Sequence, residues 1–401
     1  MVDDATLEAL QQKVWDGGRI SGAEALSLYQ LPLPVLGALA DRRRQLAQAN
    51  AQAGRGNELV TYIVDRNVNY TNVCDVYCKF CAFWRTERDA DSYVITLPEL
   101  DRKIEETIAL GGTQILLQGG HHPRLTKQWY LDLLSHVREK FPGFNVHGFS
   151  PSEFFHFQKV FGEPVADLLR DFAAAGLGSL PGGGGEILVD RVRKRISPLK
   201  ANTAQWMGVM DEAHRLGLAS TATMMFGHVE TVPERIEHLE VVRAQQDVSL
   251  GRLGLDVAGY ARGLADRTLN GGAFTAFIAW TFQAENTVLK APAVGAHEYL
   301  RMQALSRIYL DNIPSIQSSW VTQGPEVGQV ALKYGANDLG SIMIEENVVS
   351  SAGTTFCMGV ADMQRVIRDL GWEPRQRDNW YREVAAGTPT VPTASVAAEK
   401  V

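Results

Sequence analysis

The stretch NVCDVYCKFC, residues 72–81, decides how this chain folds and what chemistry it supports. It places cysteines at positions 74, 78 and 81, in the spacing Cys-x3-Cys-x2-Cys. The run LVTYIV at 59–64 precedes it, and its length and β-branched composition predict a buried strand. Three thiolates on one short loop can bind three irons of a [4Fe–4S] cubane and leave the fourth iron open to a small chelating ligand. The motif therefore predicts a cluster held by Cys74, Cys78 and Cys81 after a first strand.

A structural zinc site is the alternative interpretation of this loop. A closed zinc site needs four ligands, usually in two spaced pairs. The chain has four cysteines, and the fourth, Cys357, is distant in sequence. We expect Cys357 to be a buried structural cysteine. The crowding of the other three favours a metal site in a reducing cytoplasm over a secreted disulfide framework.

The overall composition narrows the classes of partner. The chain has 401 residues, a formal net charge of −7 and 45% hydrophobic residues. An acidic chain is a poor candidate for binding nucleic acid or a membrane surface. We find no secretory signal and no apolar run long enough for a transmembrane helix. We therefore expect a cytoplasmic protein that acts on a small molecule, with its oligomeric state left open.

Strands and helices alternate downstream of the first strand. The expected helices are 97–110, 127–140, 163–175, 202–216 and 232–246, and the expected strands are 114–118, 145–150, 177–180, 220–226, 274–280, 315–321 and 339–344. This α/β alternation predicts a parallel sheet with right-handed crossovers. Seven or eight repeats predict a (β/α)8-type, TIM-like barrel with its chemistry at the carboxyl ends of the strands.

The chain divides into one main domain with additions at both ends. We expect an N-terminal helical extension at 1–55 and a barrel domain at 56–386. Within the barrel, residues 248–272 are rich in Gly, Leu and Arg and are expected to form an inserted loop. Residues 387–401 lack periodicity and predict a disordered tail.

The cysteine loop, with an aromatic residue before its last cysteine, resembles that of the radical S-adenosylmethionine (SAM) superfamily. Six further stretches are similar to the dehypoxanthine futalosine cyclase family of menaquinone biosynthesis: DRNVNYTNVC at 65–74, LPGGGGEI at 180–187, TMMFGHVET at 223–231, WTFQAEN at 280–286, WVTQGP at 320–325 and GAND at 335–338. The likeness covers about residues 58 to 382. Cys74 is followed by Asp-Val-Tyr where the family pattern has Val-Tyr-Arg, so a basic residue beside the cluster is missing.

The resemblance implies a radical SAM oxidoreductase that forms a carbon–carbon bond. A 5′-deoxyadenosyl radical would take the C4′ hydrogen from the ribose of dehypoxanthine futalosine. The carbon radical would cyclise onto the benzoate ring, and loss of an electron and a proton would restore aromaticity. The product would be cyclic dehypoxanthine futalosine, and the electron donor a reduced flavodoxin or ferredoxin. The alternative is the sibling aminofutalosine synthase, which adds a SAM-derived radical to an enolpyruvyl benzoate.

Several residues are candidates for contact with SAM. The resemblance implies that Phe80 contacts the adenine, and simple core packing is the alternative. Gly119-Gly120 would let the backbone approach the methionine end of SAM, unless they only form a turn. Ser150 is polar at a strand end, and Glu186 would accept hydrogen bonds from the SAM ribose, unless its loop is solvated. The basic run Arg191, Arg193, Lys194 and Arg195 is either a solvated face or supplies one clamp for the SAM carboxylate.

The remaining candidates would serve the substrate. Strand alternation places His228 and Glu230 on one face, where His228 would position the substrate or move a proton, unless it is structural. The polar residues of the later strand ends would suit ribose hydroxyls and a benzoate: Gln283, Glu285, Asn286, Gln317, Ser319 and Asn337. Asp338 is the candidate base for the ring proton, with Glu230 and Glu285 in reserve, although Asn-Asp pairs also mark turns.

Overall fold

Ten parallel strands form one sheet in the computed structural model, which describes residues 4–385. Their order across the sheet is β10-β1-β9-β8-β7-β6-β5-β4-β3-β2. The strands are β1 (Leu59–Ile63), β2 (Asp65–Asn69), β3 (Gln114–Gln118), β4 (Asn145–Gly148), β5 (Leu177–Leu180), β6 (Ala219–Phe226), β7 (Phe274–Thr281), β8 (Ser315–Gln317), β9 (Asp338–Ser341) and β10 (Glu373–Gln376).

One extended segment, residues 59–69, belongs to both ends of this order. Only Val64 separates β1 from β2, yet β1 pairs with β9 whereas β2 pairs with β3. On one side Ile342 donates its backbone N–H to the carbonyl of Ile63 at 3.1 Å, and on the other Thr113 donates to Val64 at 3.3 Å. The sheet therefore curls back onto its first strand, which confirms the expected barrel-type fold. β10 pairs with the residues of β1 that precede this closure.

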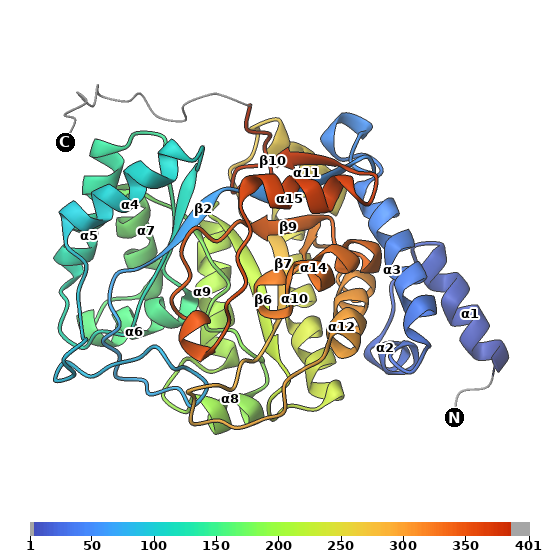
Figure 1. Ribbon diagram of the computed structural model, residues 1–401, viewed down its shortest axis with the longest axis horizontal. Helices are drawn as coiled ribbons and strands as arrows, with labels where there is room; N and C mark the ends of the chain where they lie inside the picture. The colour runs from blue at the N-terminus through green and yellow to red at the C-terminus, as the bar shows by residue number, and fades with distance from the viewer. Residues whose placement is uncertain (1–3, 386–401) are drawn as a thin grey trace.

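The helices surround the strands, as Figure 1 shows. They are α1 (Asp4–Trp15), α2 (Gly22–Leu28), α3 (Leu33–Gln48), α4 (Leu97–Ala109), α5 (Lys127–Lys140), α6 (Pro151–Phe161), α7 (Val165–Ala175), α8 (Asp190–Ile196), α9 (Thr203–Arg215), α10 (Val232–Leu253), α11 (Val257–Ala265), α12 (Ala296–Tyr309), α13 (Trp320–Gln323), α14 (Pro325–Ala331) and α15 (Val360–Arg368). Short 3-10 turns are η1 (Gln52–Gly54), η2 (Leu332–Tyr334) and η3 (Ser350–Ala352). Within residues 4–385 no helix is long and apolar enough to cross a bilayer.

Local sequence signals fix where the helices begin. Thr96 and Thr126 accept the backbone N–H of the third residue of α4 and α5, and Asn202 forms a reciprocal capping box with Gln205 at α9. The expected strand at 145–150 ends earlier, at Gly148, because Ser150 caps α6 instead. These caps place every strand-to-helix loop of the barrel at one end of the sheet.

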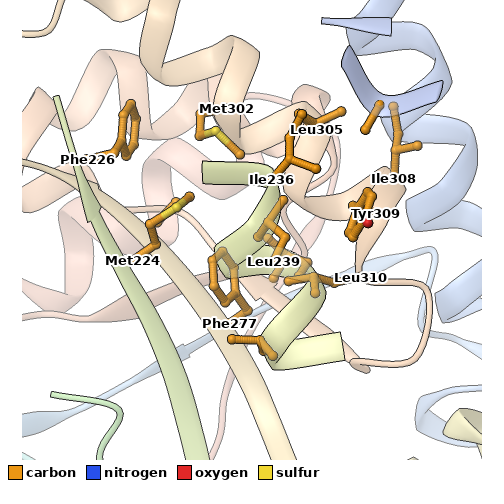
Figure 2. Close-up of a cluster of buried hydrophobic side chains, with 14 of the residues drawn as sticks. Met224, Phe226, Ile236, Leu239, Phe277, Met302, Leu305, Ile308, Tyr309 and Leu310 are labelled. Atoms are coloured by element: carbon orange, nitrogen blue, oxygen red, sulfur yellow. The ribbon is translucent and has the colours of Figure 1, made fainter. Parts of the chain in front are cut away.

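A continuous apolar layer joins the late strands to the helices that cover them. Figure 2 shows Met224 and Phe226 of β6 and Phe277 of β7 against Ile236 and Leu239 of α10 and side chains of α12. The α12 residues are Met302, Leu305, Ile308 and Tyr309, all of which are buried. Each such side chain contributes roughly 1.5–3 kcal/mol when it is fully buried. This layer fixes the late strands, and with them the loops that follow those strands.

The first three helices lie at one side of the barrel (blue in Figure 1), where α3 packs against α12. The expected inserted loop at 248–272 is largely helical instead. α10 continues to Leu253, ends at Gly254 in the left-handed conformation, and is followed by α11, which Asp256 caps. The Gly and Leu content that indicated a loop belongs to a C-cap and to a short helix whose Tyr260 is buried. The expected tail at 387–401 lies outside the described residues.

Candidate active site

The three-cysteine loop leaves the carboxyl end of β2 and is tied to three other segments. The backbone N–H of Cys74 donates to Arg85 at 3.0 Å, that of Asp75 to His121 at 3.2 Å, and that of Lys79 to Ile196 at 2.9 Å. Within the loop the backbone of Tyr77 adopts a positive φ of 51°, which residues other than glycine rarely adopt. The backbone is therefore held in one shape by its surroundings.

The thiols of Cys74, Cys78 and Cys81 lie within electrostatic reach of one another. Burial raises the pKa of Cys78, and Glu186 and the other two thiols raise it further, while Lys200 opposes them. Burial also raises the pKa of Cys74, although its sulfur accepts backbone N–H groups of Val76 and His121. Thiolates would thus form here only with compensating positive charge, which the irons of a cluster provide.

The donor set fits a [4Fe–4S] cluster better than a single ion. Among residues 4–385, no three or more His, Cys, Asp or Glu side chains are grouped so that they could hold one metal ion. The ligands of a cubane each bind a different iron, so they need not converge on one point. Cys357 does not complete the set. It is exposed rather than buried as expected, because it lies in the loop before α15 and not in a strand or helix.

Gly119 and Gly120 let the cysteine loop pack onto the end of β3. A Cβ on Gly120 would lie 2.1 Å from the carbonyl oxygen of Val73 and 3.0 Å from Cβ of Cys74. A Cβ on Gly119 would lie 2.7 Å from the ring of Tyr70. Both glycines are therefore needed for the close packing of the cysteine loop against β3.

Glu186 ends the glycine loop after β5 and has one carboxylate oxygen without a hydrogen bond. Its Oε1 accepts a hydrogen bond from Nζ of Lys200 at 2.9 Å, whereas the buried Oε2 accepts none within residues 4–385 and lies 3.6 Å from Nη1 of Arg193 as an ion pair. Its backbone is also strained, with a φ of 37°. A buried acceptor without a donor costs free energy unless a ligand supplies one. Glu186 is thus ready to accept hydrogen bonds from a bound molecule.

A basic side chain does stand beside the cluster loop, and it comes from another element. Lys200 lies after α8, and its Nζ is 5.2 Å from the centroid of the Phe80 ring. Burial would lower the pKa of Lys200, but Glu186 and Cys78 raise it above its usual value. Lys200 therefore brings a positive charge to a loop whose residues 75–77, Asp-Val-Tyr, lack the basic residue of the family pattern. Phe80 is partly buried between this ammonium and the apolar core.

Ser150 and Arg193, one member of the basic run, have structural contacts. The hydroxyl of Ser150 donates to Glu153 at 2.7 Å and accepts its backbone N–H as part of a capping box. Arg193 is buried and donates to the carbonyls of Gly184, Gly185 and Ala201, which anchors the glycine loop. The other three members of the run are exposed: Arg191, Lys194 and Arg195.

A cavity of about 300 Å³ occupies the barrel interior below these loops. Its mouth is lined by Gly182, Gly183, Gly184 and Glu186. Apolar walls come from Leu116, Ile278, Trp280 and Trp320, and polar groups from Asp65, Asn67, Gln114, Gln118, His147, Glu346 and Arg377. Of the expected substrate residues, Gln317 and Ser319 line it.

His228 and Glu230 form a closed pair outside this cavity. Nδ1 of His228 lies 3.0 Å from Oε2 of Glu230, and both side chains have no exposed surface. Burial would raise the pKa of Glu230, but His228 and Arg235 hold it well below its usual range. Glu230 also accepts two backbone N–H groups of its own turn. The pair stabilises the turn after β6, which is the structural alternative noted for His228.

Gln283, Glu285 and Asn286 follow β7 and are directed to neighbouring loops. Gln283 donates to Thr281, within its own loop. Asn286 donates to the carbonyl of Ser351 at 3.0 Å, and Oε2 of Glu285 lies where a Cβ on Gly353 would be. Both residues therefore hold the loop after β9 over the barrel mouth and do not line the cavity.

Asn337 and Asp338 lie at the beginning of β9, not at a carboxyl strand end as expected. The strand starts at Asp338 because Asn337 and Asp338 already pair with β1 and β8. Asn337 is buried and accepts hydrogen bonds from Arg307 and from the backbone of Ile316. Asp338 is fully buried and does not line the cavity. Its carboxylate binds Arg377, which does.

Four residues that line or flank the site were not among the residues expected from the sequence. They are Asp65, His147, Lys200 and Arg377. Burial and the nearby Arg377 lower the pKa of His147 to about 3, so its ring is neutral. Burial raises the pKa of Asp65, against the effects of Ser341, Gln114 and Arg377. Asp65 begins β2 in the segment shared by the resemblance, and its polar character inside a strand is the signal that could have found it.

Comparisons with known proteins agree with this geometry. The chain matches the family models described as Radical SAM superfamily at residues 68–242 and as CofH/MqnC C-terminal region at residues 271–388. It is 40% identical over 380 residues to the cyclic dehypoxanthine futalosine synthase of Halalkalibacterium halodurans, covering 94% of each chain. It is 42% identical to the enzyme of that name from Streptomyces coelicolor, covering 96% of this chain and 90% of that one. It is 34% identical to the aminodeoxyfutalosine synthase of Thermus thermophilus, covering 96% of this chain and 97% of that one.

Solved structures show the same fold at low sequence identity. The hydrogenase maturase HydG from Carboxydothermus hydrogenoformans superimposes with a TM-score of 0.65 at 14% identity, covering 94% of this chain and 81% of that one. Methylornithine synthase gives a TM-score of 0.61 at 16% identity, covering 91% and 97%. These likenesses show the fold alone.

Proposed function

This chain belongs to the radical SAM superfamily and is an enzyme of the futalosine-pathway type, and from this premise we propose that it converts dehypoxanthine futalosine to cyclic dehypoxanthine futalosine. The observation that carries the proposal is the meeting of two loops at the mouth of one cavity. Cys78 and Glu186 lie within electrostatic reach of each other, and Glu186 lines the cavity. The higher identity to the two cyclases than to the aminodeoxyfutalosine synthase supports the cyclase reaction over its sibling.

The residues at the mouth would hold the cofactors. Cys74, Cys78 and Cys81 would ligate the [4Fe–4S] cluster, and Oε2 of Glu186, which accepts no hydrogen bond within residues 4–385, would accept the ribose hydroxyls of SAM. When bound, the cluster and SAM together supply a 5′-deoxyadenosyl radical that removes the C4′ hydrogen of the substrate ribose. Lys200 would keep Glu186 oriented and add positive charge beside the thiolates. A reduced flavodoxin or ferredoxin in the cytoplasm would be the electron donor.

The deeper part of the cavity would hold the substrate. Ile278 and Trp280 offer an apolar wall for an aromatic ring, and Gln317 and Ser319 offer hydrogen-bonding groups for ribose hydroxyls. Burial raises the pKa of Asp65, which brings this carboxyl nearer to the pH at which a base works best. Asp65 lines the cavity, and its oxygens accept hydrogen bonds from the neutral side chains of Ser341 and Gln114. We therefore assign the ring proton to Asp65 and not to Asp338, which does not line the cavity and whose oxygens are held by Arg377, Thr61 and Gly340.

The proposal is tested by offering the reconstituted enzyme two substrates under anaerobic conditions. One reaction contains SAM, reductant and dehypoxanthine futalosine, and the other contains the enolpyruvyl benzoate in its place. Mass spectrometry should detect the cyclic product and 5′-deoxyadenosine in the first reaction and no adduct in the second. An adduct in the second reaction alone would assign the chain to the sibling activity.

A further inference from the structure

Arg377 is the only arginine or lysine that lines the central cavity within the described part of the chain. It follows β10, and its backbone N–H donates to the carbonyl of Tyr62 at 2.9 Å. Its neighbours Thr61 and Asp338 pair at the beginning of β9, whereas Glu186 lies beyond the carboxyl end of β5. Arg377 thus stands at the floor of the cavity, at the opposite end from the cysteine loop.

The guanidinium of Arg377 has donors to spare. Nε donates to Oδ2 of Asp338 at 2.6 Å, Nη2 to Oδ1 at 2.8 Å, and Nη1 to the carbonyl of Asp378 at 3.1 Å. Arginine carries five N–H donors, so one on Nη1 and one on Nη2 have no acceptor among residues 4–385. Asp338 occupies the edge formed by Nε and Nη2. The two remaining donors belong to the neighbouring edge, and such a fork matches the two oxygens of a carboxylate.

The orientation of this fork is fixed before any ligand binds. The carboxylate of Asp338 is itself held by Thr61 and by the backbone N–H of Gly340. The ring of Tyr381 covers one face of the guanidinium, with its centroid 4.0 Å from Cζ. A group held on three sides loses little freedom on binding, which favours affinity.

We propose that Arg377 binds the carboxylate of the substrate's benzoate group through the edge formed by Nη1 and Nη2. This inference rests on the proposed function, which supplies a benzoate. Asp338 occupies one edge of the guanidinium, and the free donors of Nη1 and Nη2 remain for one further carboxylate. Asp338 is then a positioning residue, and the aromatic ring lies between Arg377 and the cavity mouth.

Fragment binding tests this site without turnover. The probes are 3-acetylbenzoate and its neutral isostere 3-acetylbenzamide, titrated calorimetrically into the cluster-loaded enzyme with SAM. The wild type should prefer the benzoate by about ten to a hundredfold, since hydrogen bonds to charged groups are worth roughly 1.5–3 kcal/mol. Arg377→Gln alone would leave Asp338 buried without its partner, so the informative variant is the pair Arg377→Gln with Asp338→Asn. It should lose the preference, and Arg377→Lys should keep only part of it.

Arg365→Gln is the matched control, because Arg365 is an exposed arginine of α15 that pairs only with neighbours on its own helix. It should retain the full preference. Equal affinity of the wild type for the two probes, or a preference that persists in the double variant, overturns the inference. If the preference behaves as expected but no cyclic product forms, the proposed function fails while the carboxylate site stands. If cyclic product forms and the double variant keeps the preference, the function stands and the site fails.

Discussion

The Nζ atom of Lys200 lies 2.9 Å from Oε1 of Glu186, which links the loop after α8 to the glycine loop after β5. The same ammonium lies 5.2 Å from the ring centroid of Phe80, within the cysteine loop. This one side chain therefore joins the three segments that would surround SAM. It also leaves the second oxygen of Glu186 without a protein donor.

Glu186→Gln should weaken SAM binding by about ten to a hundredfold, because a neutral amide replaces a charged acceptor of hydroxyl groups. The dissociation constant of SAM, measured on the cluster-loaded protein, checks this. Glu105→Gln, on the exposed face of α4, is the matched control and should bind SAM as the wild type does. An unchanged constant in the Glu186 variant would remove the proposed role.

Cys74→Ala, Cys78→Ala and Cys81→Ala should each lower the iron content and abolish 5′-deoxyadenosine formation, because each removes a cluster ligand. Cys357→Ala should keep both, since Cys357 is exposed and outside the loop. The measurements are the iron content and the absorbance band at about 400 nm, which thiolate-bound iron gives. A cluster lost from the Cys357 variant and kept in the Cys78 variant would contradict the assignment.

Gly120→Ala should displace the cysteine loop, because the added methyl group would lie 2.1 Å from the carbonyl oxygen of Val73. We expect a lower iron content after reconstitution than in the wild type, measured at matched protein concentration. Gly208→Ala is the control. It lies in α9 with nothing within 4 Å of the added atom, so it should leave the iron content unchanged and stabilise the helix by about 0.5–1 kcal/mol. Full iron content in the Gly120 variant would show that the loop tolerates the shift.

Asp65→Asn should uncouple hydrogen abstraction from product formation. Under single-turnover conditions 5′-deoxyadenosine should still form, while the rate of cyclic product formation falls by about 10² to 10⁴, because the ring proton has lost its acceptor. Asp338→Asn should act differently, raising the substrate concentration needed for half-maximal rate through its effect on Arg377. If Asp338→Asn blocks rearomatisation and Asp65→Asn does not, the base is Asp338, as the sequence first suggested.

The buried His214 should make the protein less stable in mild acid. Burial lowers its pKa to about 3, and its ring bridges Ser249 and Ser220 at 2.7 Å each. In the unfolded chain this histidine has a pKa of about 6.5, so its ring binds a proton that it does not bind in the folded chain. The free energy of unfolding should therefore fall by about 1.4 kcal/mol per pH unit on this account as the pH decreases below about 6.5.

Denaturant titrations of the wild type and of His214→Gln at several pH values measure this contribution. The variant starts less stable, because it loses both serine hydrogen bonds, but its stability should decline less steeply with acidification. The difference between the two slopes cancels contributions from the cluster and from other titrating groups. Parallel slopes would show that the folded and unfolded chains bind the proton of His214 equally, against the expected low pKa in the fold.

The cysteine loop and the barrel could be predicted because their signals are local. Three cysteines in one loop and an alternation of apolar strands and amphipathic helices need no knowledge of distant residues. Glu186 also belongs to this group, since a carboxylate after four glycines at a strand end is unusual in any context.

The rest of the site depends on contacts between distant segments. Lys200 brings a basic group to the cysteine loop, from a segment more than a hundred residues away from Cys78. Asn337 and Asp338 were expected at a carboxyl strand end although the expected strand at 339–344 begins after them, and the structure places them at the beginning of β9. Ser150 was expected at a strand end, but it caps α6. Arg377 lies in no sequence motif.

The shared segment at residues 59–69 also sets when the site can be completed during synthesis. Its β2 half meets β3 soon after it is made, but the β1 half waits for β9 and β10, about three hundred residues later. At ~5–20 residues per second, the ribosome needs on the order of fifteen to sixty seconds to deliver them. Through that interval the strand that carries the cysteine loop has an unpaired edge. We therefore expect the barrel around these cysteines to close only after β9 and β10 have been synthesised.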